Sequence, residues 1–116
     1  MDERTREVLT QANEDYSGLY EIVWAFRSRL MPDAGEPELI SAAAEAVRAL
    51  VDRGYIRLVR FRQKPEQEVV EVPPSEVAAV LDSTDSWRPP RSWEDAYPSV
   101  DATEAGQRAW RTSPRS

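Results

Sequence analysis

The feature that most constrains the fold is a change of pattern at one glycine. Residues 37–53 carry apolar side chains at helical spacing, whereas residues 55–62, YIRLVRFR, are rich in β-branched and aromatic side chains. Gly54 stands between them and can adopt the positive φ that ends many helices. The sequence therefore predicts a long helix that passes almost directly into a strand.

Two further helices are predicted before this junction. In residues 16–31, apolar side chains recur on one face of a helix until Pro32 stops it. Asp15 is expected to cap this helix by accepting hydrogen bonds from its first-turn amides, with Tyr16 as the first helical residue. Residues 3–13 supply a shorter amphipathic helix, so three helices precede the strand.

The helix over 37–53 has a second face once its buried stripe is assigned. The stripe is predicted to contain Leu39, Ile40, Ala43, Ala44, Val47, Leu50 and Val51. The outward face then contains Glu38, Ser41, Ala42, Glu45, Arg48, Ala49 and Asp52. A helix that reads DNA presents Arg, Lys, Asn or Gln to base edges and phosphates. Three acids against one base favour an ordinary solvated face instead.

Several shorter elements are predicted after Gly54. Residues 55–62 and 68–72 are separated by the polar loop QKPEQ, a spacing typical of an antiparallel hairpin. Apolar side chains at Val77, Val80 and Leu81 indicate a short helix within 73–87. The remaining predictions are an ordered loop over 88–98, a third short strand over 99–102, a helix over 104–111 capped by Thr103, and a frayed end over 112–116.

Composition limits the class of protein. A chain of 116 residues fits one domain, here 1–116. The chain has no Cys and no run of 18 apolar residues, and its N-terminus, MDERTREVLT, lacks the apolar segment of a secretory signal. A cytoplasmic protein with no membrane partner is therefore expected. The net charge of −6 disfavours nucleic acid as a partner, because phosphates repel an acidic surface.

Two segments resemble a known family. LVDRGYIRL, residues 50–58, resembles the end of the recognition helix and the first wing strand in MarR-like and PadR-like regulators of the winged helix-turn-helix superfamily. DATEAGQRAW, residues 101–110, is similar to the strand-to-helix step that follows the wing there. The resemblance implies a winged-helix-like α+β fold with three helices, a β-hairpin or three-stranded wing and a C-terminal helix. Residues 61–100 exceed the usual wing loop, so the wing is expected to be enlarged. DNA binding is implied only as a tendency of the family.

The predicted hairpin carries a dense basic cluster. Arg57, Arg60, Arg62 and Lys64, together with Arg48 on the preceding helix, are the candidate contacts if the protein binds nucleic acid. We favour the alternative that cross-strand ion pairs neutralise the cluster. The carboxylates within hairpin distance are Glu66, Glu68 and Glu71. A regular strand would also place Arg57 on the opposite face from Arg60 and Arg62.

Aromatic side chains are the candidates for a protein interface. Four Trp in 116 residues is a high content, and Trp and Tyr commonly anchor interfaces because they bury large areas. The loop over 88–98, rich in Pro, Arg and acids, is where such an interface would be built. For Trp24 and Trp110 a place in the core is the favoured interpretation. The candidate interface residues are Tyr20, Trp24, Trp87, Trp93 and Tyr97.

Catalysis has little support in the sequence. Without His or Cys there is no Ser-His triad, thiolate nucleophile or usual zinc set, so no catalytic residue, metal or cofactor is expected. The acid pairs Glu14-Asp15 and Glu94-Asp95 are typical of solvated loops. The sequence favours a non-enzymatic module that binds another protein, of the adaptor, antitoxin or immunity type. A DNA-binding transcriptional regulator that uses the basic hairpin is the alternative.

Overall fold

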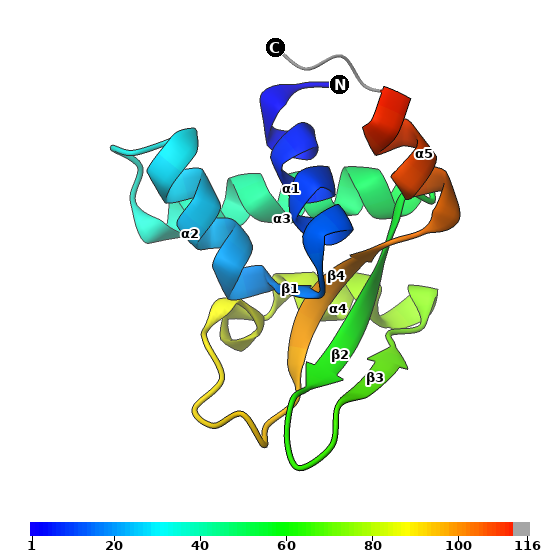
Figure 1. Ribbon diagram of the computed structural model, residues 1–116. Coiled ribbons are helices and arrows are strands. Elements are labelled where there is room, and N and C mark those ends of the chain that lie inside the picture. The colour runs from blue at the N-terminus through cyan, green and yellow to red at the C-terminus, as the bar shows by residue number, and fades with distance from the viewer. Residues whose placement is uncertain (113–116) are drawn as a thin grey trace.

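Five α-helices and four strands make up residues 1–112, the part of the chain that the computed structural model describes (Figure 1). In chain order they are α1 (Glu3–Glu14), β1 (Ser17–Gly18), α2 (Leu19–Arg29), α3 (Glu36–Asp52), β2 (Ile56–Arg62), β3 (Glu68–Glu71), α4 (Pro74–Asp82), the 3₁₀ turn η1 (Thr84–Trp87), β4 (Tyr97–Ala102) and α5 (Glu104–Thr112). The predicted α+β class is confirmed. Of the end predicted to fray, Thr112 instead belongs to α5, and residues 113–116 lie outside the described residues.

The four strands form one antiparallel sheet in the order β1-β4-β2-β3. β4 pairs with β2 along its whole length, from Tyr97 opposite Phe61 to Ala102 opposite Ile56. β1 has only two residues and adds to the other edge of β4. The predicted hairpin and the predicted third strand are therefore confirmed, although the third strand begins two residues earlier than predicted.

Two predicted caps meet at the junction after α3. Gly54 has a φ of +75°, and the Tyr55 N–H donates to the Leu50 carbonyl at 3.0 Å, the hydrogen bond that closes a glycine-ended helix. The Thr103 hydroxyl donates to the Gly54 carbonyl at 2.6 Å and accepts from the Gly106 N–H at 3.1 Å. The end of α3, the start of β2 and the start of α5 are thus held at one point.

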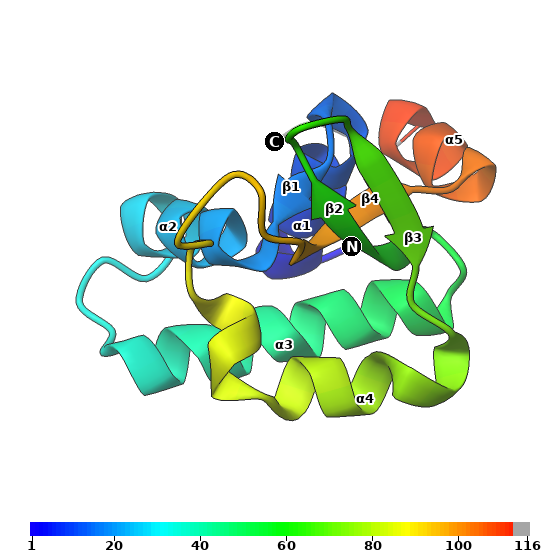
Figure 2. The same cartoon turned by 90° about the horizontal axis from the view of Figure 1, so that it is seen from below.

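Helices α3 and α4 lie side by side on one face of the sheet (Figure 2). Alternation along β2 turns Ile56 and Leu58 toward this face, where both are buried. The residues of α4 that join the same core are the predicted ones, Val77, Val80 and Leu81. On the other side of α3, α1 is flanked by α2 and α5 (Figure 1).

The predictions for two helices need correction. Ala42 was expected to face outward, but it is buried because the core extends from α3 to the Val8 and Leu9 side chains of α1. α2 begins at Leu19 with Gly18 as its N-cap, rather than at Tyr16 with Asp15 as its cap, because the residues before it pair with β4 instead of continuing the helix.

No helix within residues 1–112 is both long enough and apolar enough to cross a membrane.

Candidate protein-interaction surface

Four of the five aromatic residues predicted for an interface come together in space. Tyr20 and Trp24 lie one turn apart on α2, with ring centroids 5.0 Å apart and ring planes at 82°. The ring of Tyr20 also lies 5.7 Å from that of Tyr97, which in turn lies 6.4 Å from that of Trp93. We call these four residues, Tyr20, Trp24, Trp93 and Tyr97, the aromatic surface.

The aromatic surface has a buried base and two exposed ends. Tyr20 and Tyr97 are 6% and 4% exposed, whereas Trp24 and Trp93 are 52% and 47% exposed. The core location favoured for Trp24 is therefore wrong, because its side chain lies outside the buried stripe of α2. Half-exposed indole rings on a buried base leave apolar area that a partner can cover.

Hydrogen bonds hold the loop that carries Trp93. The Asp95 N–H donates to the Ser92 carbonyl at 3.0 Å and closes a turn with Trp93 at its second position. The Lys64 N–H donates to the Trp93 carbonyl at 3.0 Å and ties this loop to the hairpin of β2 and β3. The backbone that presents the Trp93 ring is thus anchored at two points.

The other two Trp residues lie elsewhere. Trp87, a predicted interface candidate, is buried in the main core, and its Nε1–H donates to the Leu81 carbonyl at 3.0 Å. Trp110 packs partly buried against the core, as favoured from the sequence, and its Nε1–H donates to the Thr10 hydroxyl at 3.2 Å. Trp87 is therefore not available to a partner at the surface.

Two aromatic residues that sequence reasoning missed complete the base. Phe61 lies opposite Tyr97 in the sheet, with ring centroids 5.7 Å apart, and Tyr16 stacks on Phe61 at 5.0 Å. Phe61 alternates with Arg60 and Arg62, so strand alternation could have assigned it to the face opposite those arginines. Tyr16 gave no local signal, because its position depends on the pairing of β1 with a distant strand.

A cavity of about 440 Å³ opens beside this base. Its aromatic walls are Tyr16, Phe61 and Tyr97. Three carboxylates also line it, those of Glu14, Asp15 and Glu21, and none of its lining residues is basic. In the described part of the chain, no ion pair involves any of these three acids. We call this space the acidic cavity.

The negative charge of the acidic cavity reaches the buried phenols. Burial raises the pKa of Tyr20, and the charge of Glu21 raises it further. Burial also raises the pKa of Tyr97, although a hydrogen bond from the Gln63 amide, at 3.1 Å, opposes this, and the charges of Glu21 and Asp15 add to the rise. The acidic cavity and the aromatic surface therefore share one electrostatic environment.

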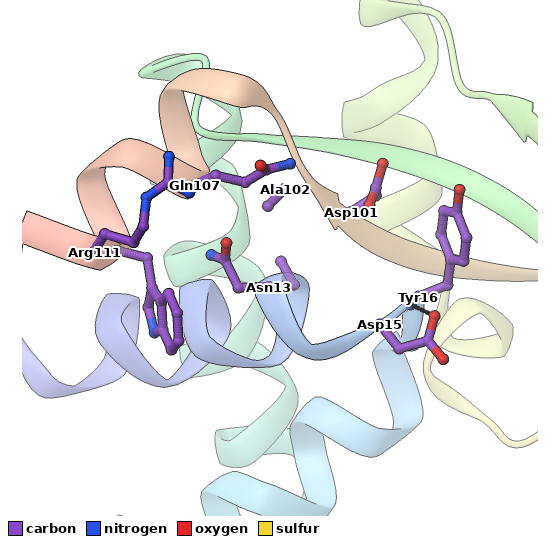
Figure 3. Close-up of a pocket in the computed structure, with 9 residues that line it drawn as sticks. Asn13, Asp15, Tyr16, Asp101, Ala102, Gln107 and Arg111 are labelled. Carbon is purple, nitrogen blue, oxygen red and sulfur yellow. Dashed lines mark hydrogen bonds between the residues drawn. The ribbon is translucent and has the colours of Figure 1, made fainter.

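A second cavity, of about 410 Å³, lies between α1, β4 and α5 and shares Asp15 and Tyr16 with the first (Figure 3). Its charge is mixed, because Arg111 lines it together with Asp101. Figure 3 shows the Asp15 carboxylate pointing away from the Asn13 side chain in this cavity. The second cavity thus lacks the uniform negative charge of the acidic cavity.

The basic residues of the hairpin do not form one patch. Arg57 Nε lies 2.8 Å from Asp101 Oδ2, and its Nη1 lies 3.4 Å from Glu71 Oε1. The bond to Asp101 raises the pKa of Arg57. Arg62 pairs with Glu68 at 3.0 Å. Cross-strand pairing, the interpretation favoured from the sequence, is therefore observed for two of the three glutamates proposed.

Arg60 and Lys64 remain exposed, and neither forms an ion pair within residues 1–112. Arg60 lies on the face opposite Arg57, where it lines a cavity of about 390 Å³ together with Glu76 and Asp85. Acids next to Arg60 weaken its attraction for phosphate.

The remaining nucleic-acid candidate, Arg48, lies beside α4. Its Nη2 is 3.5 Å from Asp82 Oδ1 at the end of α4. α4 runs along α3 in Figure 2, and residues of both helices line one groove. The face by which α3 would enter a DNA groove is thus partly occupied by another helix.

No protein-family model, curated protein or solved structure matches the chain. The inference of function therefore rests on the surface itself.

Proposed function

We propose that this protein is a non-enzymatic interaction module that binds another protein through the aromatic surface. The observation that carries this proposal is the exposure of Trp24 and Trp93 at the two ends of a chain of ring contacts. Binding energy at protein interfaces is concentrated in a few residues, and Trp and Tyr are enriched among them. Proteins of the adaptor, antitoxin and immunity types act in this way, by occupying a partner.

We further propose that the scaffold of the module is winged-helix-like. Its support is the order of the elements, three helices and then an antiparallel hairpin. The two segments that carry the resemblance, 50–58 and 101–110, also touch through the hydrogen bond from Thr103 to Gly54. The enlarged wing of this scaffold would then consist of β3, α4 and the loop that presents Trp93.

A DNA-binding regulator is the second candidate, favoured by the exposure of Arg60 and Lys64. It has less support than the interaction module, because Arg57 and Arg62 are already paired with carboxylates and α4 lies along α3.

Capture of a partner from a native lysate of the source cells tests the interaction module. The tagged wild-type protein is expected to retain a partner, and Trp24→Ser/Trp93→Ser is expected to lose it with an unchanged circular dichroism spectrum. Val70→Ser is the matched control, since Val70 is also 52% exposed but lies on β3. If the double variant captured the partner as well as Val70→Ser does, the aromatic surface would not be the interface.

A further inference from the structure

Three carboxylates of the acidic cavity have no cation of the described chain beside them. Glu14 and Asp15 are exposed at the end of α1. Glu21 lies in the first turn of α2, where it accepts the Gly18 N–H at 3.3 Å. Like charges around one cavity repel each other, and a cation from outside relieves this repulsion. The cavity is therefore complementary in charge to a basic ligand.

The walls of the cavity suit an organic cation. Tyr16, the one partly exposed ring of the three that line it, can attract a guanidinium or ammonium group and pack against an aliphatic stem, while Phe61 and Tyr97 are buried. A metal ion is a poorer match, since no three His, Cys, Asp or Glu side chains among residues 1–112 are placed to hold one. An arginine or lysine side chain satisfies both the carboxylates and the ring of Tyr16.

The acidic cavity adjoins the aromatic surface at Tyr97. Tyr97 lines the cavity, and its ring contacts those of both Tyr20 and Trp93. Two basic residues of the chain lie near the outer ends, Arg27 three residues after Trp24 and Lys64 beside the Trp93 backbone. Because these cations repel the positive charge of a ligand, that charge would be directed toward the cavity. The Trp rings would then contact apolar parts of the ligand.

We infer that the partner binds with a basic segment, which places an arginine or lysine side chain in the acidic cavity and covers Trp24 or Trp93 with an adjacent apolar side chain. This inference rests on the proposed function, because it names the chemistry of the partner that the aromatic surface binds.

The test is a calorimetric titration of the full chain at low salt with a capped decapeptide of alternating Arg and Leu, which carries both the cation and the adjacent apolar side chain. The wild-type protein is expected to bind this peptide and not the matching peptide of Glu and Leu. Glu14→Gln/Asp15→Asn is expected to weaken binding by about fivefold or more, as is Trp24→Ser/Trp93→Ser. The control Glu38→Gln/Glu45→Gln removes the same charge from the exposed face of α3 and is expected to stay within about twofold of wild type.

Several results would overturn the inference. The inference is wrong if the peptide does not bind, or if it binds Trp24→Ser/Trp93→Ser as tightly as wild type. It is also wrong if Glu14→Gln/Asp15→Asn and Glu38→Gln/Glu45→Gln weaken the affinity equally, because net charge alone would then attract the peptide. A homodimer in sedimentation that Glu14→Gln/Asp15→Asn dissociates would assign the cavity to a second copy of the chain.

The capture experiment separates this inference from the proposed function. If Trp24→Ser/Trp93→Ser loses the partner but Glu14→Gln/Asp15→Asn retains it, the interaction module is supported and the basic segment of the partner is ruled out. If both variants retain the partner, both the proposed function and the inferred basic segment are ruled out.

Discussion

The aromatic surface and the basic residues of the hairpin are linked by the pairing of β4 with β2, yet their side chains have different neighbours. In the hairpin, Arg57 lies opposite Asp101 in the sheet, and the ion pair between them neutralises its charge within the molecule. At the aromatic surface, Tyr97 lies opposite Phe61, and this buried pair supports a Trp93 ring that is half exposed. The Arg57 side chain is thus engaged within the molecule, whereas the Trp93 ring is left available to a partner.

The difference shows that closeness in sequence is a poor guide to a shared surface. Residues 57–64 hold four basic side chains, but strand alternation and acidic neighbours separate them. The aromatic surface takes residues from 20–24 and from 93–97, which only the sheet brings together. A side chain is available to a partner only when no residue from a distant segment has already engaged it.

The strongest way to sharpen this comparison is to truncate buried and exposed rings of the aromatic surface in turn. Tyr97→Ala should lower the free energy of unfolding by about 3 kcal/mol or more, because it leaves a cavity beside Phe61 and Tyr20. Trp93→Ala should cost about 1 kcal/mol or less, because nearly half of its surface is already in water. Urea unfolding followed by circular dichroism measures both. Equal costs would show that Trp93 belongs to the core.

The parts of the fold that the sequence predicts correctly are those with local causes. The Gly54 and Thr103 caps, the hairpin and the apolar residues of α4 each follow from a few neighbouring residues. The late start of α2 does not, because Ser17 pairs with Val100, far along the chain.

The candidate site is predicted only in part for the same reason. Aromatic content identifies Tyr20, Trp24, Trp93 and Tyr97, but it does not separate them from Trp87, whose burial depends on how η1 packs against the core. The acids of the acidic cavity look like ordinary loop residues until the sheet places them beside aromatic rings.

Alkaline pH should distinguish the two regions by a smaller effect. The pKa of Tyr20 is raised in the folded protein above the ordinary value of 10.0. The unfolded chain therefore loses this phenol proton first, and the free energy of unfolding should fall as the pH rises above about 10. The slope is at most about 1.4 kcal/mol per pH unit for each such phenol. Arg57, whose pKa is raised by Asp101, keeps its charge over this range.

Urea unfolding between about pH 9 and pH 11 measures this loss, and Tyr20→Phe should reduce the slope because it removes one of the phenols. A Tyr20→Phe slope identical to that of the wild type would mean that Tyr20 ionises as it does in the unfolded chain.

The smallest expected effect is the salt dependence of DNA binding by the hairpin. If Arg60 and Lys64 are the only hairpin cations free to contact phosphate, the logarithm of the affinity should fall with the logarithm of salt concentration with a slope of about −2. Two contacts of this kind give weak binding that disappears near physiological salt. Fluorescence anisotropy of a short labelled duplex, titrated with salt, measures the slope. Arg60→Ala/Lys64→Ala should abolish it, and Arg62→Ala should leave it unchanged because Glu68 already holds that guanidinium.

If the logarithm of the DNA affinity fell with the logarithm of salt concentration more steeply than about −4, the contrast between the hairpin and the aromatic surface would no longer hold. Such a slope would require Arg57 and Arg62 to exchange their carboxylate partners for phosphates, which surface ion pairs of this exposure can do at low energetic cost. The ion pairs would then be a resting state of a DNA-binding hairpin, and the half-exposed Trp rings of the aromatic surface would no longer be the stronger indication of function.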